Sequence, residues 1–244
     1  MPHFKFPVEY VYWTGIEDHT RIKQELLPIV FDIMKNGCIE NPFKKCTMKT
    51  TITQKYKLLN QEQIHKVIFE PMLKMISEID DPFLNTLNME NICATSQWFN
   101  VYDKGDFQEL HEHLHNGKPG TILVDGKYCD EIFSVVYILH DKSRESSLVF
   151  KDGEVVFNTS NQKDIHEGCV LIFPSSLEHE VKPIEIPGRI TFAFNVAYNF
   201  RWKDILQIVS QFVSSVPIDE VGCPPPHSYL SRPSQSTKLI VPCT

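Results

Sequence analysis

The chain has 244 residues, 42% of them hydrophobic, which is enough for one domain with a substantial core. Acidic residues outnumber basic ones 31 to 24, and a formal net charge of −7 argues against a general nucleic-acid-binding protein. The seven cysteines are odd in number and form no C-x-x-C, a pattern typical of reduced intracellular thiols rather than disulfides or a zinc ribbon. With no visible signal peptide and no apolar run of membrane-spanning length, we expect a soluble, cytoplasmic protein.

Residues 1–95 are predicted to form a helical and strand-containing support region of the same domain. Apolar residues recur with helical spacing from 19 to 36, and a glycine follows. A second helix is predicted to begin at Asn60, with Gln63 as its capping-box partner and Pro71 kinking or dividing it. Five lysines surround a Thr-rich segment of this region: Lys44, Lys45, Lys49, Lys55 and Lys57. This lysine cluster is either an ordinary solvated face or a dock for an anionic substrate group.

Residues 96–200 have a different sequence pattern, with short segments rich in β-branched and aromatic residues separated by turn signals. The predicted strands are Trp98–Tyr102, Phe133–Leu139, Leu148–Lys151, Val155–Asn158, Val170–Phe173 and Arg189–Tyr198. Many short strands without alternating helices indicate an antiparallel sandwich or jelly roll. The glycine-containing segment 114–131 is long for a hairpin connection, and we interpret it as a lid. Residues 201–216 are predicted to be a C-terminal helix, and 217–244 a weakly ordered Pro/Ser-rich tail.

Three histidines and one arginine form the most informative pattern in this β-rich part. His111 and His113 are two residues apart, so on a strand their side chains face the same side and can reach one metal ion. His179 lies in a separate predicted segment and can supply a third ligand. Arg189 follows ten residues later, and a guanidinium can hold a carboxylate by a two-pronged, charge-assisted pair. The pattern therefore predicts a non-heme metal site beside an anion-binding group.

These stretches resemble the prolyl-4-hydroxylase-like branch of the 2-oxoglutarate/Fe(II) dioxygenases. That family carries Y-x-x-G-x-x-x-x-x-H-x-D, then an apolar strand, then H-E-V-x-P, with a basic residue nine or ten positions after the second His. The residues in register with the family pattern are Tyr102, Gly105, His111, His179, Glu180, Val181, Pro183 and Arg189. The likeness extends from about Trp98 to Tyr198, under half of the chain. His113 stands where the family has its metal-binding Asp, and in this the chain is similar to uncharacterised phage and bacterial relatives.

The resemblance implies a mainly β fold with flanking helices, the double-stranded β-helix of cupin-like jelly rolls. It implies a hydroxylase that uses Fe(II), 2-oxoglutarate and O2, with ascorbate as an optional accessory, and that releases succinate and CO2. The substrate would be a peptidyl side chain, with proline as one candidate, or a small molecule. By the same resemblance, His111, His113 and His179 are the catalytic metal ligands. The co-substrate would be contacted by Arg189, through its C5 carboxylate, and by Thr191, Tyr102, Tyr137 and Asn195.

Replacement of the family Asp by neutral His113 raises the charge of the protein–Fe(II) unit from one to two positive charges. The incoming 2-oxoglutarate dianion then neutralises the site, so the replacement is compatible with co-substrate binding. A three-His set also suits zinc, which most sites bind more tightly than Fe(II). Two other interpretations of the histidines stay open: a shifted ligand pair of His113 with His115, and a solvated surface run.

Two other functions are also compatible with the sequence. One is a three-His cupin-type dioxygenase that works without 2-oxoglutarate, although Arg189 and Thr191 argue against it. The other is a non-catalytic jelly-roll binding or structural module, in which Arg189 would be an ordinary surface residue. Dependence of turnover on 2-oxoglutarate, and metal content, separate these functions from the hydroxylase.

Overall fold

The structure is a computed structural model that describes residues 3–5, 9–36, 47–51, 58–113, 121–124, 127–143 and 147–199. The helix expected over 201–216 and the tail expected over 217–244 lie outside these residues, as do four of the five clustered lysines. The fifth, Lys49, is exposed and pairs with Asp103 at 3.0 Å, as expected for a solvated face. None of the helices in the described ranges has the length and apolarity needed to cross a lipid bilayer.

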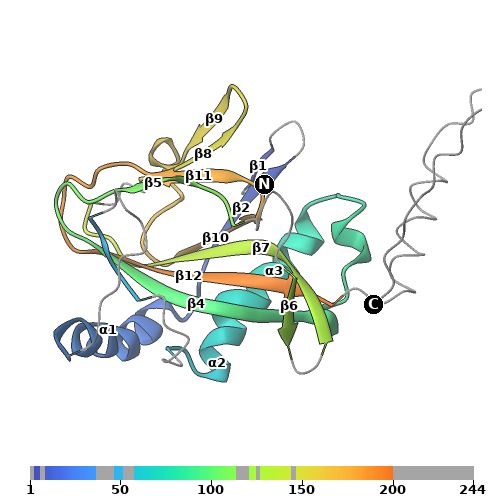
Figure 1. Cartoon of the computed structure of the whole chain (residues 1–244), viewed down its shortest axis with the longest axis horizontal. Helices are drawn as coiled ribbons and strands as arrows, with labels where there is room; N and C mark the ends of the chain where they lie inside the picture. Colours follow the sequence, from blue (N-terminus) through green and yellow to red (C-terminus); the bar gives the residue numbers. More distant parts are fainter. Residues whose placement is uncertain are drawn as a thin grey trace, which may run out of the picture.

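Two antiparallel sheets face each other, and helices cover the outer face of the larger one (Figure 1). The larger sheet has the order β1-β2-β10-β7-β12-β4-β3, with β6 paired to β7. Its strands are β1 (His3–Lys5), β2 (Tyr10–Gly15), β3 (Lys49–Thr50), β4 (Ile92–Tyr102), β6 (Thr121–Val124), β7 (Lys127–His140), β10 (Cys169–Pro174) and β12 (Arg189–Tyr198). The smaller sheet, in the order β5-β11-β8-β9, contains β5 (Gln108–His111), β11 (Glu178–Val181), β8 (Leu148–Asp152) and β9 (Val155–Asn158). This is the expected double-stranded β-helix with flanking helices.

The helical elements are α1 (His19–Asn36), α2 (Gln61–Ile64), the π-helical turn η1 (His65–Phe69), α3 (Glu70–Glu78) and the 3₁₀ turns η2 (Leu84–Thr86), η3 (Met89–Asn91) and η4 (Thr159–Asn161). The predicted helix over 19–36 is confirmed as α1. The predicted capping box is also confirmed, because Asn60 accepts from the backbone of Gln63 and the Gln63 side chain accepts from the backbone of Asn60. The second helix is divided: η1 interrupts it, and Pro71 lies in the first turn of α3.

All six predicted strands are present, and β4 and β7 extend well beyond their predicted bounds. The lid expected over 114–131 is wrong in its second half, because β6 pairs with β7 and these residues extend the larger sheet. The β-branched residues of β6 are typical of such pairing, and the Asp-Gly turn signal lies between the two strands. Residues 114–120 lie outside the described ranges.

Strand alternation divides the interior into two cores on opposite faces of the larger sheet. On β12, Ile190, Phe192 and Phe194 pack in the core beneath α1, α2 and α3. The alternate residues Arg189 and Thr191 face the smaller sheet instead. A second apolar cluster, with Phe150 and Phe173 among its members, fills the space between the sheets. The functional side chains therefore lie between the two sheets, while the helices support the larger sheet from behind.

We predict that Gly168→Ala destabilises the fold by about 2–3 kcal/mol, because a left-handed backbone and a steric overlap act together. Gly168 has a φ of +92°, and a Cβ added there would lie 2.9 Å from Cγ of His19. Gly15 is a matched control, since a Cβ there meets no atom within 4 Å. Urea unfolding should give Gly15→Ala a free energy of unfolding close to that of wild type. Equal values for the two variants would contradict the prediction.

Candidate metal and co-substrate site

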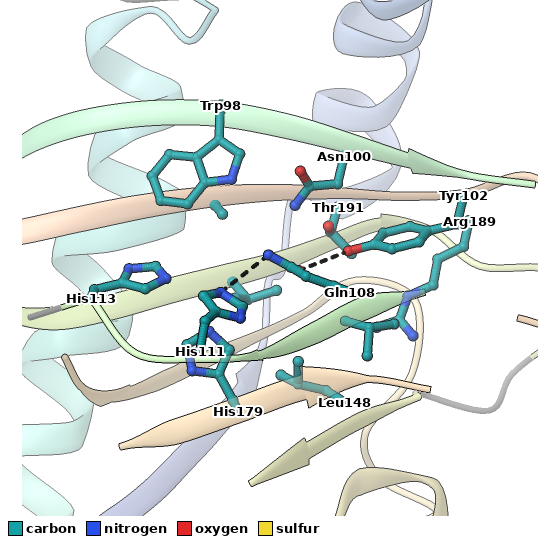
Figure 2. A pocket seen from close by; sticks show the side chains of 13 residues that line it. Trp98, Asn100, Tyr102, Gln108, His111, His113, Leu148, His179, Arg189 and Thr191 are labelled. Carbon is teal, nitrogen blue, oxygen red and sulfur yellow. Dashed lines mark hydrogen bonds between the residues drawn. The ribbon is translucent and has the colours of Figure 1, made fainter. Parts of the chain in front are cut away.

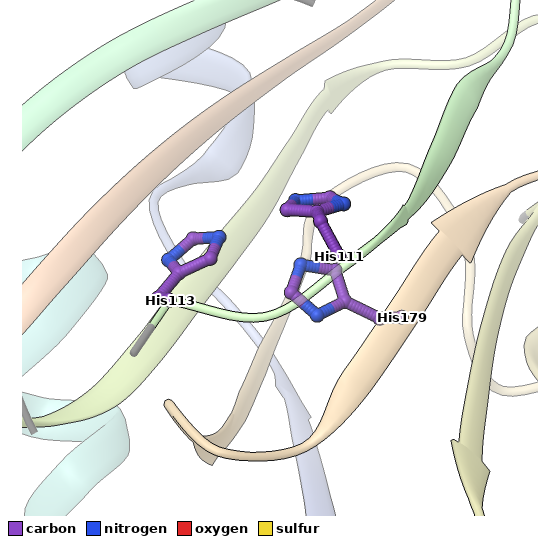
Figure 3. Close-up of side chains that lie close together, drawn as sticks. All are labelled: His111, His113 and His179. Atoms are coloured by element: carbon purple, nitrogen blue, oxygen red, sulfur yellow. The ribbon is translucent and has the colours of Figure 1, made fainter. Parts of the chain in front are cut away.

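Three imidazoles from two neighbouring strands form one cluster between the sheets (Figure 3). His111 ends β5 and lies directly opposite His179 on β11, with ring centroids 4.2 Å apart. His113 lies just beyond β5, where its backbone N–H donates to the carbonyl of Ser175 at 2.9 Å. One candidate ligand atom from each of the three rings lies within 4.8 Å of the others. Within the described residues, this is the group of His, Cys, Asp or Glu side chains that can share a metal ion.

Each Nδ1 atom of the cluster has an oxygen partner, which fixes the tautomers. His111 Nδ1 lies 2.8 Å from the carbonyl of Glu109, and His179 Nδ1 lies 3.0 Å from the carbonyl of Leu177. A carbonyl oxygen only accepts, so both Nδ1 atoms carry the proton. His113 Nδ1 lies 2.8 Å from Oδ1 of Asn195 and donates to it in the same way. The three Nε2 atoms therefore keep their lone pairs, as metal-binding histidines require.

Burial keeps these imidazoles neutral. It lowers the pKa of His111, and together with neighbouring His111 it lowers the pKa of His113 to about 4. The pKa of His179 falls well below its ordinary value, first because of burial and then because of the two neighbouring imidazoles. Neutral imidazoles are the form that binds a metal ion, so near pH 7 protons do not compete for the Nε2 atoms.

The donor set fits a divalent transition metal. Metal–nitrogen bonds of about 2 Å allow donor atoms to lie at most about 4 Å apart, so the rings must close by about 1 Å around an ion. Imidazole suits iron and zinc alike, and three imidazoles leave coordination positions for other ligands. The His113/His115 alternative cannot be compared with this set, because His115 lies outside the described residues.

The carboxylate-binding candidates Arg189, Thr191 and Tyr102 line the same pocket as the histidines (Figure 2). All three side chains are buried, with exposed fractions of 2%, 3% and 1%. The Arg189 guanidinium carbon lies 5.9 Å from the centroid of the Tyr102 ring, and its Nε lies 3.7 Å from Oδ2 of buried Asp141. A guanidinium has five N–H donors, so Arg189 can bind a second anion beside Asp141.

Two of the predicted co-substrate contacts are not brought to this end of the pocket. Tyr137 lies opposite Phe192 in the β7–β12 pairing, so it faces the helices, where its hydroxyl lies 2.7 Å from Nδ1 of His19. Asn195 does face the smaller sheet, but it lies beside His113 and holds that ring. The structure therefore places Asn195 with the metal cluster and places Tyr137 behind the sheet.

Several lining residues were not predicted from the sequence. Ser134 is paired with Asn195 across β7 and β12, and its hydroxyl lies 2.9 Å from Nδ1 of His113. Asn100 is 4% exposed, and its Oδ1 has no hydrogen-bond partner among the described residues, which marks a place for a ligand or water. Gln108 and Trp98 complete the walls near the histidines. On β4, Phe99 and Val101 face the helix-covered core, so Trp98 and Asn100 lie on the opposite face together with Tyr102. Strand parity alone would have predicted this.

Comparison with known proteins agrees with this geometry. Residues 96–195 match the model of the family described as "Putative 2OG-Fe(II) oxygenase". The matched segment is under half of the chain. It contains the three histidines, Arg189, strand β7 and parts of β4 and β12, so the part of the chain that is similar to this family holds both the metal cluster and the candidate carboxylate-binding group.

Solved structures of this fold include a prolyl-4-hydroxylase from Pseudomonas putida, 14% identical, with a TM-score of 0.51 over 78% of this chain and 92% of that one. Another is SnoK, a non-heme alpha-ketoglutarate-dependent carbocyclase from nogalamycin biosynthesis, 10% identical, with a TM-score of 0.51 over 77% and 79%. At these identities the likeness establishes the shared fold. No curated protein matches the sequence.

We predict that Asn195→Ala weakens metal binding by about 10-fold, because it removes the oxygen that fixes the tautomer and orientation of His113. Asn195→Asp keeps an oxygen acceptor at this position and should retain wild-type affinity or exceed it. Calorimetric titration of the metal-depleted protein with Co(II) measures both constants. If Asn195→Ala instead left Co(II) affinity intact and weakened only 2-oxoglutarate binding, Asn195 would be a co-substrate contact after all.

Proposed function

We propose that this protein is a 2-oxoglutarate- and Fe(II)-dependent oxygenase that hydroxylates a C–H bond of a peptidyl substrate, with proline as one candidate, or of a small molecule. In this proposal His111, His113 and His179 hold Fe(II), and Arg189, assisted by Thr191, binds the C5 carboxylate of 2-oxoglutarate. Tyr102 adds a phenolic contact. The observation that carries the proposal is that one pocket is lined by three neutral imidazoles at one end and by a buried guanidinium at the other.

The pocket has a buried end and a more exposed end. Arg189 and Thr191 are almost fully buried, whereas His111, His113 and Trp98 are partly exposed. The far carboxylate of the co-substrate would therefore lie deepest, and its 2-oxo acid end would lie at the metal, nearer the opening. The Trp98 ring lies 5.7 Å from the His113 ring and offers a flat wall on that side. We assign the substrate to this open end, beside Trp98.

The chain's own residues would then perform three tasks. The imidazoles hold the ion through Nε2 atoms whose orientation is fixed by their Nδ1 hydrogen bonds. Arg189 orients the co-substrate, and the buried walls exclude water from the reacting atoms. Bound Fe(II) and 2-oxoglutarate supply O2 activation by oxidative decarboxylation, with succinate and CO2 as products.

We predict that the Fe(II)-reconstituted protein slowly converts 2-oxoglutarate to succinate even without substrate, and that His179→Ala abolishes this turnover because it removes one metal ligand. Succinate formation and O2 consumption are measured in parallel. O2 consumption that needs iron and an organic substrate but no 2-oxoglutarate would favour the three-His cupin-type dioxygenase. Absence of any iron-dependent turnover across a broad panel of peptides and small molecules would favour the binding module.

We predict that Arg189→Ala weakens 2-oxoglutarate binding by about 30- to 1000-fold, or about 2–4 kcal/mol, because it removes one partner of a buried charge pair. Co(II) affinity should change little, since Arg189 is not one of the three clustered ligands. Arg189→Lys should recover part of the co-substrate affinity, because it keeps the charge and loses the fork geometry. Calorimetry of the Co(II)-loaded variants with 2-oxoglutarate gives these constants.

The control for this variant addresses Asp141, which Arg189→Ala leaves as an unbalanced buried charge. Arg189→Ala/Asp141→Asn removes that charge and should recover thermal stability without recovering 2-oxoglutarate affinity. Wild-type affinity in either alanine variant would show that Arg189 does not bind the co-substrate.

A further inference from the structure

Gln108 connects the two ends of the pocket by a pair of hydrogen bonds (Figure 2). Its side-chain Nε2 lies 3.1 Å from Nε2 of His111, and its Oε1 accepts from the Tyr102 hydroxyl at 3.3 Å. The side chain is 6% exposed and lies at the start of β5, three residues before His111. An amide has both a donor and an acceptor, which is what a link between these two groups requires.

The hydrogen bond to His111 uses the same lone pair that a metal ion would use. His111 Nδ1 is protonated, because it donates to the carbonyl of Glu109. In this tautomer Nε2 carries no proton, so it is the acceptor and the Gln108 amide nitrogen is the donor. A nitrogen lone pair cannot bind a metal ion and accept this hydrogen bond together. The Gln108 amide and the metal ion therefore compete for one atom.

The position of Gln108 in the pocket is a second observation that points to this side chain. The cavity between the histidines and Arg189 is lined by Gln108 as well. A five-carbon diacid that reaches from the metal to Arg189 would pass the side chains that lie between these groups. Gln108 lies there, between His111 and Tyr102 (Figure 2).

We propose that Gln108 is a co-substrate-binding residue that is released from His111 by the metal ion and then donates its amide hydrogen bond to 2-oxoglutarate. This inference rests on the proposed function, in which the pocket binds metal and 2-oxoglutarate together. It makes Gln108 a link between two binding steps: the metal breaks the hydrogen bond to His111, and the freed amide gains the incoming anion as its acceptor.

Loss of the Gln108 amide should change the affinities for metal and for co-substrate in opposite directions. Without the amide, the metal no longer displaces a hydrogen bond, so metal binding becomes tighter. Without the amide, the co-substrate loses a donor, so its binding becomes weaker. A variant that merely disturbed packing would weaken both steps.

The test variant is Gln108→Met, which has similar length and volume but neither a donor nor an acceptor. Calorimetric titration of metal-depleted protein with Co(II), followed by titration of the Co(II)-loaded protein with 2-oxoglutarate, gives both dissociation constants. We expect Co(II) to bind about 3- to 10-fold more tightly than in wild type, and 2-oxoglutarate about 3- to 10-fold more weakly, the effect of one hydrogen bond. Gln108→Glu should shift both constants in the same directions and further, because a carboxylate attracts the metal and repels the dianion.

The matched control is Gln97→Met, since Gln97 lies on β4 and accepts a hydrogen bond from the backbone of Leu59 instead. Its two constants should stay within about 2-fold of wild type. In each Gln108 variant, Co(II) should bind more tightly than in wild type and 2-oxoglutarate more weakly. The proposal is overturned if the two constants of a variant do not move in these opposite directions. Failure of the wild-type Co(II) protein to bind 2-oxoglutarate is a separate result and would reject the proposed function itself.

Discussion

The two-residue alternation of β12 is the constraint on which the rest of the structure depends. Ile190, Phe192 and Phe194 are buried under the helices, and this burial fixes which face the intervening residues occupy. A slip of one residue would bury Arg189 against the helices and turn phenylalanine rings toward the histidines. That slip would bury a charged group in the apolar core and remove phenylalanine side chains from it, and both changes are unfavourable. Hydrophobic packing on the helix-covered face of the sheet therefore determines which side chains line the pocket on the other face.

Burial of the pocket also requires that its charges balance. Three neutral imidazoles leave a bound Fe(II) with its two positive charges, which a 2-oxoglutarate dianion would match. Arg189 adds one more positive charge, and Asp141, buried at 3.7 Å, matches it. An aspartate at the position of His113 would add a negative charge to this set. The H-x-H and the buried Asp141 are therefore mutually consistent, since together they bring the loaded pocket close to neutrality.

The family resemblance predicted His111, His179 and Arg189 in one pocket, and strand parity joined His113 to His111 and Thr191 to Arg189. Other features depend on tertiary register, which spacing does not contain. Tyr137 was assigned to the wrong face, since its orientation follows from its pairing with Phe192. Asn195 was on the correct face but beside a different group. Asp141 and Ser134 are ordinary polar residues until the fold brings them to Arg189 and His113. Gln108 is three residues before His111 on the same strand, but spacing does not show that its amide reaches the ring.

The same contrast between deep and open ends bears on substrate choice. The deep end is formed by Tyr102, Arg189 and Thr191, whose side chains are almost fully buried. The open end lies around Trp98, beside the partly exposed His111 and His113. Residues there can vary without disturbing the helical support, so one fold can keep its co-substrate and change its substrate. Under the proposed function, the residues around Trp98 therefore select the substrate, while Arg189 and Thr191 serve the co-substrate.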